Sequence, residues 1–140
     1  MLEEYQDLIE ELLGTPRIVR EAMESGHDEE RVRLLGALHE RDKVALDRIQ
    51  RLTRETSPHL TVLPLLDDAI AGTEMPHDMS AFLDQFDTTR GDLVSLLMNL
   101  TLKDWERTAT SDRGGEVALV DEVEIHVEFD EAFRERFAAL

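Results

Sequence analysis

The stretch VDEVEIHVEFDEAFRERF, residues 120–137, determines how the end of the chain folds. Its apolar residues recur at intervals of three and four, which predicts an amphipathic helix over residues 118–137. The inward arc of this helix contains Leu119, Val123, Val127, Phe129, Phe133 and Phe137. Two polar residues, His126 and Asp130, fall in the same sector, so we expect them to point into the protein.

The same spacing predicts another long helix over residues 28–55, with Asp28 as its N-cap. Its apolar stripe consists of Val32, Leu35, Leu38, Ala45, Leu46, Ile49 and Leu52. At about 100° per residue, His39 and Asp42 lie inside this stripe. These two residues are therefore the inward polar groups of the second helix.

Two further amphipathic segments bring the number of long helices to four. The first covers residues 2–23, and we expect it to be interrupted near Pro16, where Thr15 can cap a restarted helix. The other begins with Ser80 as N-cap and continues to about residue 100. A capped turn that carries Trp105 and a polar loop at residues 111–115 separate it from the last helix.

Residues 56–80 form a long connection between the second and third helices. They contain three of the four prolines, Pro58, Pro64 and Pro76, together with Gly72. We expect one short helical turn within it, at residues 66–71. A connection of this length suggests a crossover rather than a tight hairpin. With no convincing strand, the sequence predicts an all-α four-helix bundle, with the 140 residues forming a single domain.

Composition excludes several classes of function. The 15 basic and 32 acidic residues give a net charge of −17, which disfavours nucleic acid and anionic membrane as partners. The chain has no cysteine, so thiolate metal sites and thiol nucleophiles are excluded. No segment is long and apolar enough to span a membrane, and the acidic N-terminus is unlike a signal peptide, so we expect a cytoplasmic protein. The ferritin-like Glu-x-x-His motif is absent because Glu122 and His126 stand four residues apart.

Three segments together resemble one known family. Residues 8–20 (LIEELLGTPRIVR) look like its opening helix, and residues 38–42 (LHERD) match the His-x-x-Asp of its second helix. Residues 86–130 contain LTLKDW, GEVAL and VEFD, which are similar to its Leu-Thr-x-x-Asp turn, its Gly-x-Val-x-Leu motif and its final His-Asp-x-x-His. On these motifs the chain resembles the DinB-like superfamily of four-helix metalloproteins, which includes the YfiT-like proteins.

The resemblance implies a bundle with a divalent metal in its core and a homodimeric assembly. The family's ligands are one histidine on the second helix and a His-x-x-x-His pair on the last. His39 fills the first place, whereas Phe129 and Phe133 occupy the other two, and Asp42 and Asp130 match the neighbouring acidic positions. A phenyl ring has no lone pair to donate, and one imidazole cannot supply the three protein ligands of a typical Zn or Ni site. We therefore expect a degenerate metal site.

Alternatives remain for these residues. His39, His126 and Asp130 can form a displaced set of two histidines and one carboxylate for Zn, Ni or Mn. His126 is equally interpretable as a neutral core histidine, and Asp42 either as a group that orients a ligand imidazole or as a hydrogen-bonded core residue. A slip of one residue in the last helix would put Asp130 and Arg134 at the ligand places, again without a histidine pair.

The sequence therefore predicts a non-catalytic binding or interaction module, without a metal and with a residual pocket between the second and last helices. The alternative is a divalent-metal-dependent enzyme of the hydrolase or thiol-transferase type. In that case His39, His126 and Asp130 would hold the ion and a bound water would be the nucleophile. The sequence identifies no small-molecule ligand.

Overall fold

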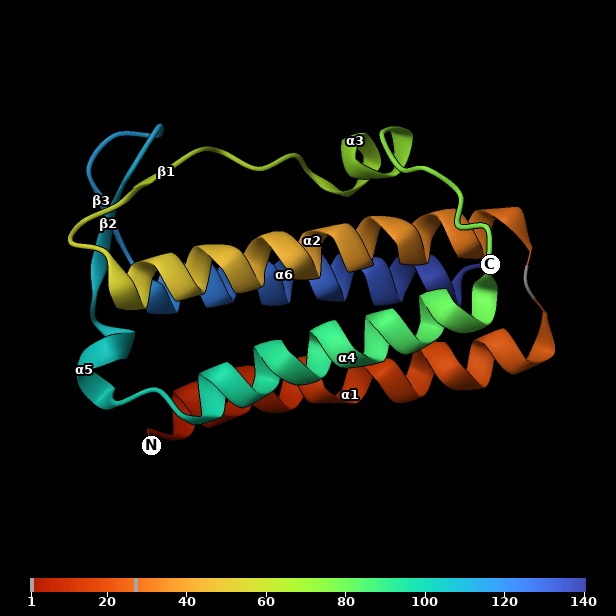
Figure 1. The fold of residues 1–140 in the computed structure, drawn as a ribbon, viewed down its shortest axis with the longest axis horizontal. Coiled ribbons are helices and arrows are strands. Elements are labelled where there is room, and N and C mark those ends of the chain that lie inside the picture. Colours follow the sequence, from red (N-terminus) through yellow and green to blue (C-terminus); the bar gives the residue numbers. More distant parts are fainter. Residues whose placement is uncertain (1, 27) are drawn as a thin grey trace.

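The computed structural model describes residues 2–26 and 28–140, in which four long helices pack side by side (Figure 1). They are α1 (Glu3–Ser25), α2 (Glu29–Arg54), α4 (Met79–Met98) and α6 (Leu119–Ala138). Helices α1 and α2 each pack against both α4 and α6. The expectation of an all-α bundle is confirmed. No helix within the described ranges combines the length and apolar character needed to cross a membrane.

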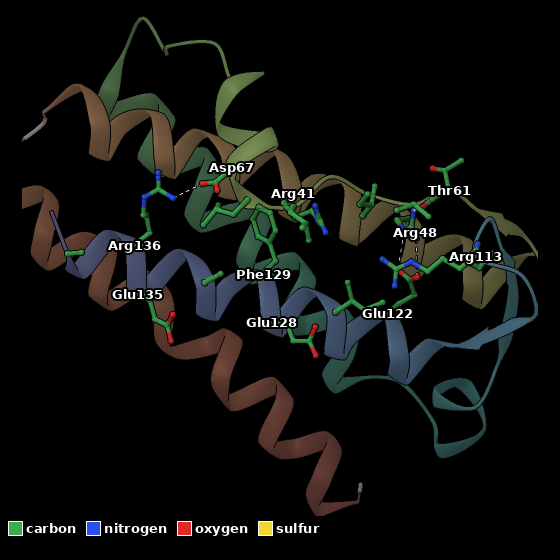
Figure 2. A pocket seen from close by; sticks show the side chains of 18 residues that line it. Arg41, Arg48, Thr61, Asp67, Arg113, Glu122, Glu128, Phe129, Glu135 and Arg136 are labelled. Carbon is green, nitrogen blue, oxygen red and sulfur yellow. Dashed lines mark hydrogen bonds and ion pairs between the residues drawn. The ribbon is translucent and has the colours of Figure 1, made fainter.

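Helices α2 and α4 are joined by a connection, residues 55–78, that contains β1 (His59–Leu60) and the expected short helix α3 (Leu66–Ala71). Figure 1 shows the connection returning along α2, so that α2 and α4 run in the same direction and α1 and α6 in the opposite one. Figure 2 shows Arg48 of α2 beside Thr61 of the connection. Nη1 of Arg48 donates to the backbone carbonyl of Thr61 at 2.8 Å. The connection is therefore held against the bundle.

Three short strands form a small sheet at one end of the bundle (Figure 1). Strand β1 pairs in parallel with β2 (Thr108–Ser111), which pairs antiparallel with β3 (Glu116–Ala118). The turn of the β2–β3 hairpin places Gly114 and Gly115 at φ values of 86° and 77°, where glycine is favoured. The expectation of no strand was wrong, because strands of two to four residues are too short to show an alternating pattern.

Helix capping agrees with the sequence at two of the four expected positions, and Thr15 lies inside α1 rather than at a cap. Asp28 caps α2, and Thr101 opens α5 (Leu102–Trp105) with a capping box, as expected. The N-cap of α4 is Asp78 rather than Ser80, since the Asp78 carboxylate accepts the backbone N–H three residues later. Helix α4 therefore begins earlier than the sequence indicated.

The apolar core consists of two clusters separated by polar residues. One cluster includes Trp105, which stacks on Tyr5 with 4.4 Å between ring centroids. The other is rich in phenylalanine and contains Phe82, Phe86, Phe129, Phe133 and Phe137. Buried polar residues lie between the two clusters on every long helix: Thr15 on α1, Asp42 on α2, Arg90 on α4, and His126 and Asp130 on α6. We call these five residues the polar layer.

The connection packs closely against α2 at Gly36. A methyl group at Gly36 would lie 2.6 Å from Cγ2 of Thr73, whereas one at Gly91 on α4 would meet no atom within 4 Å. Replacing glycine by alanine inside a helix normally raises the free energy of unfolding by about 1 kcal/mol. We expect Gly91→Ala to show this gain in urea denaturation and Gly36→Ala to lose it. Equal stabilisation by both substitutions would contradict the close packing of the connection.

Candidate functional site

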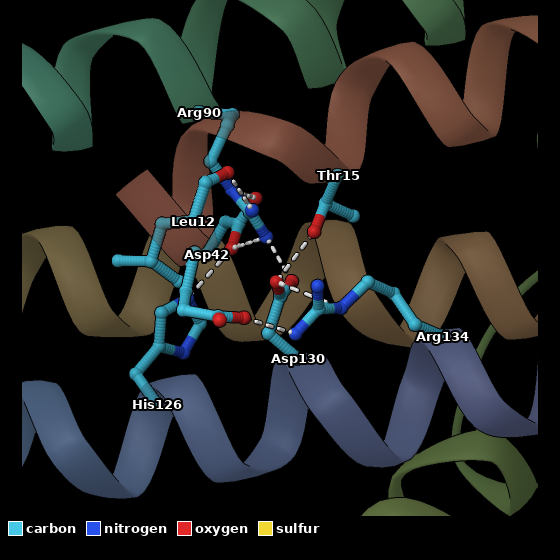
Figure 3. Close-up of polar contacts among 8 residues, drawn as sticks. Leu12, Thr15, Asp42, Arg90, His126, Asp130 and Arg134 are labelled. Atoms are coloured by element: carbon cyan, nitrogen blue, oxygen red, sulfur yellow. Dashed lines mark hydrogen bonds and ion pairs between the residues drawn. The ribbon is translucent and has the colours of Figure 1, made fainter. Parts of the chain in front are cut away.

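The polar layer is centred on the guanidinium group of Arg90 (Figure 3). Arg90 is only 1% exposed. Its Nε and Nη2 donate to the two carboxylate oxygens of Asp42, each at 2.9 Å. Nη2 also donates to Oδ1 of Asp130 at 2.7 Å, and Nη1 donates to the backbone carbonyl of Leu12 at 2.7 Å. Arg90 of α4 therefore binds a group on each of the other three long helices.

Pro16 explains why the Leu12 carbonyl is available to Arg90. In a continuous α-helix the N–H of residue 16 would donate to the carbonyl of residue 12, but proline has no N–H. The expected interruption near Pro16 was wrong, because α1 continues without a break from Glu3 to Ser25. The carbonyl that Pro16 leaves without a helical donor accepts from Arg90 instead, which offsets part of the cost of a proline inside the helix.

The remaining members of the polar layer complete its hydrogen bonding. The Thr15 hydroxyl, expected as a helix cap, donates to Oδ2 of Asp130 from the interior of α1. Nε2 of His126 lies 2.8 Å from Oδ1 of Asp42, and its Nδ1 is buried without a partner in the described part of the chain. Every carboxylate oxygen of Asp42 and Asp130 thus has at least one donor.

The ion pair between Asp42 and Arg90 remains charged at neutral pH. Burial acts to raise the pKa of Asp42, but the Arg90 guanidinium and the hydrogen bond with His126 outweigh burial and lower that pKa. Burial acts to lower the pKa of Arg90, but Asp42 and Asp130 outweigh it and raise that pKa above its ordinary value. The polar layer is thus a cation surrounded by its own counter-charges.

His39 lies outside the polar layer, among aromatic rings. Its ring is edge-on to Phe82 and Phe86, with centroid distances of 5.4 and 6.4 Å, and the residue is 5% exposed. Burial, followed by the charge of Lys43, lowers the pKa of His39. Nδ1 makes no hydrogen bond with the described residues. His39 is therefore held as a neutral imidazole.

The residues of the displaced metal set are not brought together. His39 faces aromatic rings, His126 is bound to Asp42, and Asp130 is bound to Arg90. Within residues 2–26 and 28–140, no group of three His, Asp or Glu side chains is arranged to hold a metal ion. In this arrangement His39, His126 and Asp130 do not fit a metal.

The two phenylalanines that the sequence resemblance places at ligand positions, Phe129 and Phe133, are part of the core. Phe133 is fully buried and stacks on Phe137 with 5.0 Å between centroids. Phe129 is 6% exposed, and its ring lies 4.3 Å from the guanidinium carbon of Arg41. Each buried ring contributes roughly 1.5–3 kcal/mol of apolar stabilisation. A slip of one residue in the last helix would instead place Asp130 and Arg134 at the ligand positions. Their Oδ2 and Nε atoms lie 3.9 Å apart, so they are a carboxylate beside a cation.

A cavity of about 670 Å³ lies between α2, α6 and the connection (Figure 2). It lies between the second and last helices, as the expected pocket does, and Phe129 lines it, but His39 and Asp42 do not. Four arginines line it: Arg41 and Arg48 on α2, Arg113 on the hairpin turn and Arg136 on α6. Sequence reasoning missed them because they come from three separate segments, and arginines beside an apolar stripe are usually solvated.

Two of these arginines are paired with carboxylates. Nε and Nη2 of Arg48 donate to the two carboxylate oxygens of Glu122, each at 3.0 Å. Nη1 of Arg136 donates to Asp67 at 2.6 Å, which joins α6 to α3. Arg48 and Arg136 therefore hold the connection and α6 in place around the cavity.

Arg41 lacks such a partner. Its residue is 7% exposed, its Nη1 donates to the Pro64 carbonyl at 2.6 Å, and its guanidinium lies over Phe129. It forms no ion pair with a carboxylate of the described residues. Burial, followed by the charge of Arg48, lowers the pKa of Arg41 to about 10, so it remains a cation at neutral pH.

Comparison with known proteins shows the fold. No protein-family model and no curated protein matches the sequence. The structure is similar to YfiT from Bacillus subtilis, with a TM-score of 0.74 over 99% of this chain and 89% of that chain, at 16% sequence identity. YfiT is described as a probable metal-dependent hydrolase with an unusual four-helix bundle topology. The likeness supports the four-helix fold that the sequence indicated, and the DinB-like superfamily stays a prediction from the sequence motifs.

Arg90→Met tests the polar layer. The substitution leaves Asp42 and Asp130 buried without their cation, and we expect it to lower the free energy of unfolding by about 3–5 kcal/mol. Arg20→Met is the matched control, because it breaks an exposed pair with Asp87, at 2.8 Å, and should cost less than about 1 kcal/mol. Both values come from urea denaturation. Similar small losses for both variants would contradict the central place of Arg90.

His39 should make stability depend on pH. Its folded pKa lies below the ordinary value of 6.5, so its contribution is complete above that pH and is lost as the pH falls through the folded pKa. We expect His39→Phe to reduce the loss of stability between about pH 7 and pH 5 in urea titrations, because the variant cannot take up a proton there. His77→Gln, at an exposed position, is the control and should leave the loss unchanged. An unaltered loss in His39→Phe would show that His39 titrates normally.

Proposed function

We propose that this protein is a non-catalytic binding module on a DinB-like four-helix scaffold. The observation that carries the proposal is the engagement of both inward aspartates by Arg90. A divalent cation held by Asp42 or Asp130 would lie beside a buried guanidinium. Repulsion between like charges is strong inside a protein, so the polar layer disfavours a metal there.

The cost of rearrangement supports the same proposal. To gather His39, His126 and Asp130 around one ion, His126 would have to leave Asp42 and Asp130 would have to leave Arg90. Breaking buried pairs in this way costs several kcal/mol, because the abandoned charges remain buried. Phe129 and Phe133 offer no replacement ligands at the positions that the resemblance assigns to histidine.

The second candidate is a divalent-metal-dependent enzyme of the hydrolase or thiol-transferase type. The fold likeness to YfiT, a probable metal-dependent hydrolase, favours it. The ligands would then be His39, His126 and Asp130, which do not fit that role as they stand. The homodimer and the cytoplasmic location implied at the sequence level stay predictions, which sedimentation and fluorescent tagging in cells would test.

Metal analysis separates the two candidates. Protein purified without an affinity tag should contain no stoichiometric Zn, Ni or Mn by plasma mass spectrometry. Adding these ions should leave the melting temperature unchanged, since a ligand that binds only the folded state must raise it. One ion per chain that disappears in His39→Ala but persists in His77→Ala would support the enzyme and refute the binding module.

A further inference from the structure

We propose that the cavity between α2, α6 and the connection binds a small organic anion, with Arg41 as the group that holds the anionic head. The head is a phosphate or a carboxylate, and the body attached to it is apolar. This inference rests on the proposed function, because it names the class of ligand that the binding module would take.

The charges around the cavity differ from those of the whole chain. The chain has 15 basic and 32 acidic residues, yet four of each line the cavity. The acids are Asp67, Glu122, Glu128 and Glu135. Because the net charge of −17 repels anions at long range, an anion site here requires guanidinium groups concentrated at short range. The lining of the cavity is balanced in formal charge, in contrast to the acidic chain as a whole, and it gathers four guanidinium groups around one volume.

Arg41 is the arginine of the cavity whose buried charge has no counter-ion. Arg48 is neutralised by Glu122 and Arg136 by Asp67, whereas Arg41 bonds one backbone carbonyl and an aromatic face. The Arg41 residue is only 7% exposed, and a buried cation is costly unless an opposite charge accompanies it. A ligand anion would supply that charge.

The contact of Arg41 with the connection uses only part of its hydrogen-bonding capacity. The bond to Pro64 uses Nη1 alone, and the planar fork of an arginine can bind a phosphate or carboxylate through two parallel N–H groups. Arg113, an exposed residue on the hairpin turn, lines the same cavity and adds a further positive charge. The geometry therefore suits an anion better than a neutral polar ligand.

The walls define the rest of the ligand. Ile125, Phe129 and Ala132 of α6 line one side, and Leu63 and Leu66 line the other. The volume of about 670 Å³ lies within the usual range of small-molecule sites, roughly 300–1,000 Å³. An inorganic anion alone would leave these apolar surfaces uncovered, so the ligand carries an apolar body.

Three probes that share a naphthyl ring test the charge requirement: 1-naphthyl phosphate, 1-naphthoate and 1-naphthol. They are titrated into chelator-treated, metal-free protein by calorimetry and by ¹H–¹⁵N NMR. We expect at least one of the two anions to bind about tenfold or more tightly than naphthol, because charge-assisted hydrogen bonds are the strong ones. The tighter anion identifies the head group. Amide shifts should centre on residues that line the cavity.

Variants test the assignment to Arg41. Arg41→Met keeps an unbranched side chain over Phe129 but removes the charge, so the preference for the anion over naphthol should fall about tenfold. Arg54→Met removes the same charge from an exposed position at the end of α2 and should not change the preference. Ala132→Trp fills the cavity while every arginine remains, and should abolish binding of all three probes. The NMR titration of the unaltered protein applies even if a variant does not fold.

Naphthol binding as tightly as both anions, shifts centred outside the cavity, or an unchanged preference in folded Arg41→Met would overturn the inference. Failure of the proposed function is distinguishable from this failure. Stoichiometric metal in the purified protein would refute the binding module, while the probes are measured after the metal has been removed. Absence of an anion preference in metal-free protein refutes only the ligand class.

Discussion

The guanidinium of Arg90 is the group on which the bundle depends. It donates to Leu12 of α1, Asp42 of α2 and Asp130 of α6 from its own position on α4, so all four long helices meet at one cation. A buried cation is tolerable only when its donors are satisfied, and these contacts require each helix to lie at one height along the bundle. Apolar packing alone tolerates many small shifts, whereas this set of bonds does not. Arg90 therefore supplies register as well as counter-charge.

Two local irregularities become intelligible once Arg90 is considered. Pro16 would be expected to break α1, yet the carbonyl that it leaves without a donor accepts from Arg90. Thr15, the residue beside it, donates to Asp130 in the same layer. Both residues disfavour a helix interior when taken alone. Their positions in α1 thus follow from the polar layer rather than from helix propensity.

The sequence predicted which residues point inward better than it predicted their partners. Helical spacing placed His39, Asp42, His126 and Asp130 inside the bundle, and all four are buried. It did not reveal Arg90, although Arg90 stands four residues after Phe86 and three before Leu93, a spacing that puts it on the apolar stripe of its helix. Because arginine is usually exposed to solvent, this spacing alone did not predict that Arg90 is buried. Hydrogen-bond partners from different helices depend on tertiary packing, which spacing within one helix does not encode.

Arg90 and Arg41 differ in how far their buried charges are compensated within the protein. Burial acts to lower the pKa of both guanidinium groups, but Asp42 and Asp130 overcome this for Arg90, whereas Glu122 does not overcome it for Arg41. A cation whose electrostatics are complete within the protein gains little from a ligand. A cation that faces a cavity without a counter-ion gains a great deal, because the ligand supplies the missing charge. The electrostatics of Arg90 are thus complete within the core, and the incomplete electrostatics lie at Arg41.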